Sequence, residues 1–409
     1  MKHKPKRAAA VDMEVTAPDP KVHADEMIDL VCKVFGTGGF YAFRDYCRNG
    51  YVYRSHYDWA ASRIGIVGGR IATHYGVWDY RMRVGSAVLR VGGIGVVATD
   101  PAYRGKGLMA RTIEATHEAM RAGGYDLAML FGIRDFYHRY GYCRAWSERI
   151  YYVERSRIPK GRPKTRWRKF TEFTGKDIER MHNRETAGLT GSAVRPTYTT
   201  HMANDRNWSG YRWNDASGRL AGYVVVTTRW GKFECVELGG DVEEGLKLLG
   251  ILAHRAGYNE VKLFGVHYGS ALGAWLRRNN ARLEMSYWRS GGPMVCTINL
   301  ASSLKKLCPE LERRLKSSCL AGWSGKLLIQ DARESAALDI RRSRVAVVAP
   351  GRASHSIRGG NEIAQLLIGT DEPVEVIESG GMRLSGDARE LAAVLFPNQH
   401  PNLAPADRY

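Results

Sequence analysis

Two glycines, an arginine and a lysine stand together just before a segment with helical periodicity, as Arg104-Gly105-Lys106-Gly107. Glycine lets the backbone approach a ligand closely, and the first amides of a helix have no partner inside the helix. These amides lie at the positive end of the helix dipole and bind phosphate groups without help from side chains. In this context the stretch predicts a pyrophosphate site, although the Gly-x-Gly triplet taken alone indicates only a turn.

The elements around this loop are those that would hold it in place. An apolar strand is expected at 94–98, a helix over 107–122, a buried strand at 127–131 and a helix-like patch at 134–139. The order strand, glycine loop, helix, strand, helix is typical of a layered α/β fold. Upstream, a helix is expected at 25–35 and strands at 62–67, 70–80 and 86–91.

The rest of the chain indicates two further units. The basic run 155–169 contains two prolines and is interpreted as a linker. The second unit repeats the order of the first, but its helix follows the sequence ELGGD and has no Arg-x-x-Gly loop. Its expected elements are helices at 176–184, 241–256 and 269–279 and strands at 220–228, 233–238 and 261–266. A third unit starts near 298, with helices at 304–316, 360–368 and 387–395, strands at 325–331, 336–340 and 344–349, and an extended tail.

Length and composition describe an ordinary globular protein. A chain of 409 residues is too long for one core, so two or three domains are expected. We see no apolar run that could span a bilayer, and no apolar segment follows the charged start as in a signal peptide. The seven cysteines are odd in number and never spaced C-x-x-C, which predicts reduced thiols, no zinc site and a cytoplasmic location.

The formal net charge of +19 is unusual and points to a polyanionic partner. Nucleic acid, an anionic membrane surface and a phosphate-rich cofactor all fit this charge. The basic residues are spread along the whole chain, however, and no zinc-finger, basic-zipper or RNA-recognition signature accompanies them. Nucleic-acid binding is therefore the minor interpretation, and a single cofactor does not require so large a charge.

Two stretches resemble the GNAT N-acetyltransferases. VVATDPAYRGKGLMARTIEA is similar to motif A, in which an Arg/Gln-x-x-Gly-x-Gly/Ala loop holds the pyrophosphate of acetyl-CoA, with Met109 where the pattern is usually small. DFYHRYGYCRAW is similar to the Phe-Tyr-x-x-x-Gly-Phe segment, whose tyrosine lies beside the CoA sulfur and commonly acts as general acid. That role falls on Tyr137, and Gly141 and Tyr142 end the segment.

The layout of the whole chain resembles the Eis (enhanced intracellular survival) family. The resemblance implies an α/β protein with two tandem GNAT folds, the second degenerate, and a C-terminal sterol-carrier-like (SCP2-like) α+β domain. The corresponding boundaries are 1–155, 156–297 and 298–409. The family acetylates amines, including aminoglycosides, and assembles as hexamers. Its C-terminal carboxylate serves as general base, which here is the α-carboxylate of Tyr409.

The resemblance also implies a set of acetyl-CoA contacts and no metal. Acetyl transfer needs a neutral amine, a donor for the thioester oxygen and a proton for the leaving thiolate. A strand amide near 97–99 would meet the oxygen, Tyr137 would supply the proton, and no protein nucleophile is required, so Cys143 is expected to be a buried, inert thiol. The carried-over contacts are Val97, Ala98, Thr99, Arg104, Gly105, Lys106, Gly107, Leu108, Met109, Ala110, Gly132 and Ile133.

Other interpretations stay open at this point. His138, or His74 and Asp79 on the strand before motif A, are alternative bases, although such residues are usually solvent-facing. Local acidity for a cationic acceptor is available from Asp25, Glu26, Asp45, Asp58, Asp79 and Asp407. A lipid or sterol carrier built on the third unit, with the acetyltransferase units as scaffold, is the alternative function. A nucleic-acid or membrane-surface binder that uses the basic linker is a further one.

Overall fold

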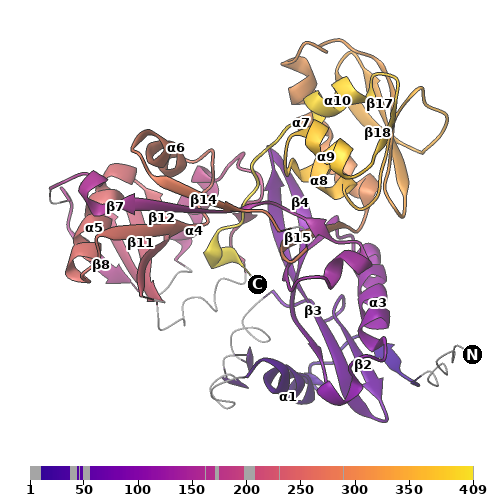
Figure 1. Cartoon of the computed structure of the whole chain (residues 1–409), viewed down its shortest axis with the longest axis horizontal. Coiled ribbons are helices and arrows are strands. Elements are labelled where there is room, and N and C mark those ends of the chain that lie inside the picture. The colour runs from indigo at the N-terminus through magenta and orange to yellow at the C-terminus, as the bar shows by residue number, and fades with distance from the viewer. Residues whose placement is uncertain are drawn as a thin grey trace, which may run out of the picture.

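Three β-sheets, each covered by helices, form three lobes of the molecule (Figure 1). The computed structural model describes residues 11–36, 44–45, 47–48, 56–161, 163–170, 175–197, 208–229, 231–288 and 290–408. The layered α/β class expected from the sequence is confirmed. No helix among these residues combines the length and the apolar character that crossing a membrane requires.

The first sheet has eight strands, and its central pair is parallel. Helix α3 (Leu108–Ala122) is the crossover between the two central strands, β4 and β5, and α1 (Ala24–Phe35) also packs on this sheet. The order is β1-β2-β3-β4-β5-β15-β6, with β9 paired to β3. The strands are β1 (Glu14–Thr16), β2 (Arg63–Val67), β3 (Arg70–Val84), β4 (Ala87–Thr99), β5 (Leu127–Gly132), β6 (Cys143–Arg144), β9 (Ala193–Val194) and β15 (Gly292–Thr297).

Strand β4 is continuous, so the expectation of two separate strands at 86–91 and 94–98 is wrong. The glycines between them do not interrupt the strand. A Cβ on Gly92 would lie 2.3 Å from Met120 Cε of α3 and 3.0 Å from Val77 Cγ1, so a side chain at this position would require the Met120 side chain to move. Gly92 thus marks the place where the Met120 side chain of α3 packs on the sheet, and the strand passes through it.

The second sheet has seven strands in the order β14-β7-β13-β12-β11-β10-β8. Its parallel strands, β12 and β13, are connected by helix α5. This is the same arrangement as β4, α3 and β5 in the first sheet. The basic run interpreted as a linker ends in edge strand β8. The elements are β7 (Glu148–Glu154), β8 (Trp167–Phe170), β10 (Trp208–Asn214), β11 (Leu220–Arg229), β12 (Lys232–Gly240), β13 (Glu260–Phe264), β14 (Arg282–Ser286), α4 (Lys176–Glu185), α5 (Val242–Arg255) and α6 (Ala271–Arg278).

The first two sheets exchange a strand across the expected boundaries at 155/156 and 297/298. Strand β7, from the first segment, pairs between β13 and β14 of the second sheet. Strand β15, from the second segment, pairs between β5 and β6 of the first sheet. Strand β7 pairs with β13, and β15 pairs with β5, so each exchanged strand lies beside the second strand of a parallel pair. Each unit thus supplies the same strand of the other unit's sheet.

The third sheet has five strands in the order β18-β17-β16-β19-β20 and packs against α7. Helix α7 begins at Leu300, four residues before the expected start, because the Asn299 side chain caps it by accepting from the Ser302 amide. The elements are α7 (Leu300–Lys316), α8 (Ile363–Ile368), α9 (Pro373–Ser379), α10 (Ala388–Leu395), β16 (Gly325–Gln330), β17 (Ser335–Arg341), β18 (Arg344–Val348), β19 (His355–Arg358) and β20 (Arg383–Ser385).

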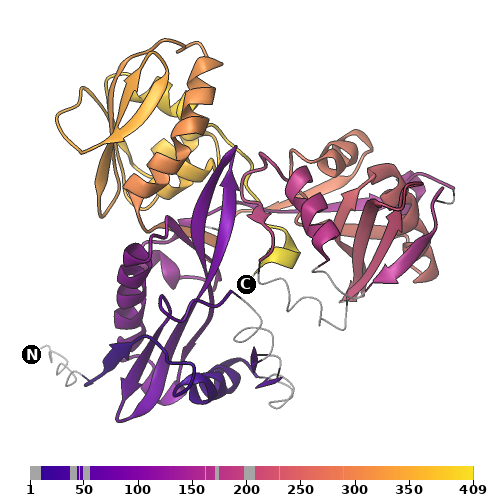
Figure 2. The ribbon, with the colours of Figure 1, turned by 180° about the vertical axis from the view of Figure 1, so that it is seen from behind.

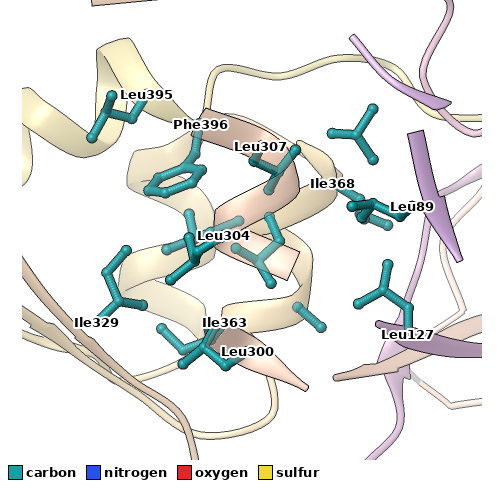
Figure 3. Packing of buried hydrophobic residues seen from close by; sticks show 14 of the residues in the cluster. Leu89, Leu127, Leu300, Leu304, Leu307, Ile329, Ile363, Ile368, Leu395 and Phe396 are labelled. Atoms are coloured by element: carbon teal, nitrogen blue, oxygen red, sulfur yellow. The ribbon is translucent and has the colours of Figure 1, made fainter. Parts of the chain in front are cut away.

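One hydrophobic core joins the third lobe to the first. Leu300, Leu304, Leu307, Leu311 and Leu315 recur at helical spacing along α7 and are fully buried. Each such burial is worth about 2 kcal/mol. Figure 3 shows α7 side chains between the first sheet and the helices and sheet of the third lobe. The third lobe is therefore fixed to the first by a shared core.

The C-terminal segment leaves the third lobe and crosses to the junction of the first two (Figures 1 and 2). It ends in the short 3-10 helix η6 (Pro405–Asp407). Residues 401–407 are buried throughout, and η6 packs against β12 of the second sheet. The last described residues are thus held by a unit that is distant from them in sequence.

Candidate active site

A cavity of about 750 Å³ opens where β4 and β5 of the first sheet diverge. The ladder between them ends at Ile94 and Leu130, while β4 continues to Thr99 and β5 to Gly132. The N-terminus of α3 and the 3-10 helix η3 (Tyr137–Tyr140) complete the walls. A single space therefore connects the glycine loop with the tyrosine segment.

A bulge in β4 shapes the floor of this cavity. Val96 and Val97 together face Tyr75 of β3, and Val96 has a positive φ of 42°. His74 holds the bulge, since its Nδ1 lies 2.9 Å from the Val96 carbonyl oxygen and its Nε2 lies 2.8 Å from the Tyr57 hydroxyl. Burial lowers the pKa of His74 to about 4, so this side chain is a neutral structural group.

The glycine loop presents unpaired backbone amides to the cavity. Gly105 and Gly107 have φ values of 74° and 75°, in the left-handed region that favours glycine. No side chain caps α3, and within the described part of the chain the amides of 105–109 donate no hydrogen bond. A Cβ at either glycine would meet nothing within 4 Å, so the space before these amides is open. The loop has the geometry of an anion site.

Most of the carried-over cofactor residues lie on this one cavity. Ala98 does not line it and faces the opposite side of β4, where it is fully buried. Lys106 is exposed, with its Nζ 5.1 Å from the Tyr103 ring centre. Gly132 makes room for Tyr137, because a Cβ there would lie 2.6 Å from the tyrosine ring. The lining residues are Val97, Thr99, Arg104, Gly105, Gly107, Leu108, Met109, Ala110 and Ile133.

Tyr137 lies in the cavity wall, as Tyr103 and Tyr140 do, and is only 8% exposed. The Phe136 ring lies edge-on to it at 4.9 Å. Burial, reinforced by the neighbouring Tyr140, raises the pKa of Tyr137 well above its usual range. Its hydroxyl forms no hydrogen bond within the described part of the chain. A protonated, unpaired hydroxyl is thus available to a group in the cavity.

A buried polar network fixes the segment that carries Tyr137. The Tyr142 hydroxyl lies 2.9 Å from the Tyr75 hydroxyl and 3.1 Å from His117 Nε2. Arg333 of the third lobe donates to the Tyr140 carbonyl at 3.0 Å and lies 3.3 Å from His117 Nδ1. Burial and the Arg333 charge lower the pKa of His117 to about 3, which keeps the imidazole neutral. The third lobe therefore helps to position the tyrosine segment.

Sequence reasoning missed the apolar part of the cavity wall. Val34 and Phe35 come from the end of α1, and no local signal connects that helix with the loop. Phe131 was recognisable as the residue before Gly132 at the end of a buried strand. The other missed lining residues are Ile94, Gly95, Val96, Tyr103, Leu130, Phe136, Arg139 and Tyr140.

Two of the alternative bases and acidic candidates, Asp79 and Asp58, have structural roles. Asp79 is bound by Arg90 in a two-pronged contact, at 3.0 and 2.9 Å, and is not a free carboxylate. Asp58 accepts from the Tyr125 hydroxyl at 2.7 Å. Cys143 is buried as expected, and burial raises the pKa of its thiol well above the usual range. Among the described residues, no three His, Cys, Asp or Glu side chains gather as a metal site requires.

The C-terminal segment reaches the same cavity wall. Asp407, a candidate for local acidity, is fully buried and accepts from Arg195 at 2.9 Å and from Thr197 at 3.0 Å. The Arg408 guanidinium lies 4.4 Å from the centre of the Phe131 ring, which lines the cavity, and 4.3 Å from that of Phe264. Tyr409, the proposed base, lies outside the described residues.

The second sheet has the corresponding cleft but not the anion site. Helix α5 is capped, because the Asp241 carboxylate accepts from the Glu244 amide at 3.1 Å. Glu243 and Glu244 add negative charge to its first turn. These carboxylates occupy the positive end of the helix and repel phosphate.

The sequence and the fold were both compared with known proteins. Among curated proteins, no sequence matches this chain. A probable N-acyltransferase from Enterococcus faecalis has a similar fold, with a TM-score of 0.77 and 17% identity over 97% of this chain and 100% of that one. A GCN5-related N-acetyltransferase from Anabaena variabilis gives 0.77 and 15%, again over 97% and 100%. Eis1 from Mycobacterium abscessus gives 0.68 and 14%, over 97% and 100%.

The sequence match falls on the part of the chain that forms the cavity. Residues 21–145 match the family described as "Acetyltransferase (GNAT) domain". This range contains α1, the glycine loop, α3, β5 and the tyrosine segment. GNAT domains use acetyl-CoA, which agrees with the open amides at the start of α3. Residues 21–145 are therefore a GNAT acetyltransferase domain, and the protein is an acyltransferase.

Proposed function

We propose that the protein transfers the acetyl group of acetyl-CoA to a primary amine by direct attack. The observation that carries the proposal is the uncapped N-terminus of α3, which opens into the cavity that Tyr137 lines. The open amides of 105–109 and the Arg104 side chain suit the pyrophosphate. The diverging ends of β4 and β5 suit the extended arm that carries the thioester.

The reacting groups can then be assigned to residues of this chain. The neutral amine attacks the thioester carbonyl, a C–N bond forms and the C–S bond breaks. The amide of Val97 is proposed to donate to the carbonyl oxygen as it becomes negative, which is supported by the position of Val97 in the bulge of β4 and on the cavity wall. Tyr137 protonates the leaving thiolate, and the pKa of its phenol, raised by burial, keeps it in the acid form until then.

The base that takes the proton from the amine is proposed to be the α-carboxylate of Tyr409. The proposal is supported by Arg408, the residue before it, whose guanidinium lies over Phe131 of the cavity wall. A glycine extension after Tyr409 would move the carboxylate by a residue and should impair turnover with little change in acetyl-CoA affinity. An unchanged rate in the extended protein would exclude this base.

The direct test is acetyl-CoA binding by calorimetry, followed by thiol release with a panel of amines. Tyr137→Phe should slow turnover and leave the affinity for acetyl-CoA intact. Tyr287→Phe, at a side chain that is 65% exposed, is the matched control and should behave as wild type. Wild-type turnover in Tyr137→Phe would refute the acid role, and absence of acetyl-CoA binding in the unaltered protein would refute the function.

The acceptor, the oligomeric state, the cellular location and the role of the third unit are further proposals, and each has its own test. We propose an aminoglycoside or another amine, including a lysine side chain, as acceptor, and mass spectrometry of reaction products identifies it. We propose a hexamer, which light scattering tests, and a cytoplasmic location, which fractionation tests. The third unit is proposed to be sterol-carrier-like and to deliver the C-terminus, and co-purified lipid would instead favour a carrier.

A further inference from the structure

The second lobe contains a cavity of its own, with a volume of about 250 Å³. It lies between the ends of β12 and β13, which is the position that the active-site cavity occupies between β4 and β5. Ala404 of the C-terminal segment forms part of its wall, and Pro405 packs against Gly265 so closely that a Cβ there would lie 2.2 Å from the proline ring. The segment thus closes one side of the cleft and leaves this cavity within it.

The electrostatic character of this cavity is opposite to that of the first. The active-site cavity has an open helix N-terminus together with Arg104 and Arg139 on its wall. The second cavity is lined by two carboxylates, Glu185 and Glu237, and by no lysine or arginine among the described residues. A site at this position therefore disfavours phosphate and favours a cation.

Glu237 is held in its ionised form. Its carboxylate accepts from Arg195 at 2.9 Å and from the Tyr223 hydroxyl at 2.7 Å, and His182 Nδ1 lies 3.2 Å away. Burial opposes ionisation, but the Arg195 charge and these hydrogen bonds lower the pKa of Glu237 far below its usual range. A carboxylate offers about four lone-pair sites, so acceptor capacity remains for a ligand.

A second side chain on the wall is buried and has one ring nitrogen without a partner among the described residues. His267 is 7% exposed, and its Nε2 has no hydrogen-bond partner within the described residues. Burial lowers the pKa of His267 to about 3, so the ring is neutral and able to accept from a donor at one nitrogen. Buried polar atoms normally have a hydrogen-bond partner. The unpaired nitrogen of His267 therefore indicates that a ligand or water molecule bonds to it in the cavity.

We propose that this cavity is a binding site for a small apolar molecule that carries one protonated amine. The apolar wall would contact the body of the ligand, and Glu185, Glu237 and His267 would receive its ammonium group. At the ~30 Å³ that one water occupies in the liquid, the cavity holds roughly eight non-hydrogen atoms. The apolar part of the wall includes Val236, Leu238, Phe264, Val266 and Leu272.

The test is calorimetric titration of the full-length protein with benzylamine, which has this size and charge. Benzyl alcohol and benzoate are the neutral and anionic analogues of the same shape. Benzylamine should bind at least about tenfold more tightly than either, because a hydrogen bond to a charged group is worth about 1.5–3 kcal/mol. Equal affinity for the three compounds, or no binding of benzylamine at millimolar concentration, would overturn the proposal.

Variants assign the binding to this cavity rather than to the active site. Val266→Phe fills the space, and Glu185→Gln removes a charge from a side chain that is 35% exposed and therefore tolerant of change. Both should weaken benzylamine at least about tenfold, while Glu375→Gln, at an exposed surface position, should not. The control at the first cavity is Gly107→Trp, which blocks that cavity and should leave the affinity for benzylamine unchanged.

The opposite result would overturn the proposal. Benzylamine affinity that is lost in Gly107→Trp and kept in Val266→Phe would place the amine in the active-site cavity and refute binding in the second cavity. Because acetyl-CoA binding is measured separately, failure here is distinct from failure of the proposed function.

Discussion

Gly107 provides the sharpest test of the pyrophosphate loop, because an alanine there separates stability from binding. The residue has a φ of 75°, and a Cβ would meet no protein atom within 4 Å. The cost to folding is then only the left-handed backbone conformation, about 1–2 kcal/mol. The new methyl group would, however, stand before the open amides of α3.

Gly124 is the matched control at the other end of the same helix. Its φ is 77°, and a Cβ there also meets nothing within 4 Å. Gly107→Ala and Gly124→Ala should therefore lose the same unfolding free energy in urea denaturation. Loss of one charged hydrogen bond to phosphate, about 1.5–3 kcal/mol, should weaken acetyl-CoA binding about tenfold to a hundredfold in Gly107→Ala alone.

The assay is calorimetric titration of both variants with acetyl-CoA, beside their denaturation curves. Equal affinities in the two variants would show that the cofactor does not approach the α3 terminus. A much larger stability loss in Gly107→Ala than in Gly124→Ala would show that the loop glycine has a structural role that its open surroundings do not explain.

Three further predictions concern the contacts between the units. Asp407→Asn should lower the unfolding free energy by about 3 kcal/mol, because it leaves part of the Arg195 charge buried without its partner. The control is Asp387→Asn, at a half-exposed side chain, which should change the unfolding free energy by less than about 0.5 kcal/mol. Equal urea midpoints for the two variants would contradict this prediction. Burial opposes ionisation of Glu310, but hydrogen bonds from Arg313 and Ser86 and the Arg314 charge lower its pKa from 4.5 to about 2. A carboxyl group whose pKa is lower in the folded state stabilises the fold at any pH above its pKa in the unfolded state. The unfolding free energy of the wild type should therefore exceed that of Glu310→Gln by its full amount above pH 4.5, and the difference should shrink towards pH 2. A difference that does not depend on pH would refute the ion-pair explanation. Residues 11–147 alone should not fold, because strand β5 would have an open edge where β15 pairs in the whole protein. Joining residues 290–298 to this fragment through a glycine-rich linker should restore the missing strand and a dispersed NMR spectrum. A folded fragment 11–147 would show that the exchanged strand is dispensable.

The sequence contained the local part of the active site. The unpaired amides of 105–109 follow from a glycine loop at a helix start, and both are visible as residue types at a fixed spacing. Tyr137 was identified in another way, through the resemblance of its segment to the Phe-Tyr-x-x-x-Gly-Phe segment of the GNAT family. The unpaired amides depend on neighbours within about ten residues, so pattern and backbone chemistry are enough to predict them, whereas the tyrosine needed the resemblance.

Features that depend on distant segments could not be predicted in this way. His74 looked like a solvent-facing strand residue, but it is buried because a bulge in β4 needs a partner for the Val96 carbonyl. Asp407 looked like an available carboxylate, but Arg195 lies in a different unit and neutralises it. The expected boundaries assumed contiguous sheets, whereas β7 and β15 each pair in the other unit.

The sequence by itself determined the α/β elements and the glycine loop with unpaired amides at the start of α3. Each of these depends on the conformational freedom of glycine, the unpaired ends of a helix or the periodicity of apolar residues. The tertiary structure alone decided that the two sheets exchange strands, that the third lobe holds the tyrosine segment through Arg333, and that the second cleft is acidic and closed by the C-terminal segment. Those outcomes depend on which buried charges and strand edges meet in space, and residues far apart in sequence supply the two sides of each contact.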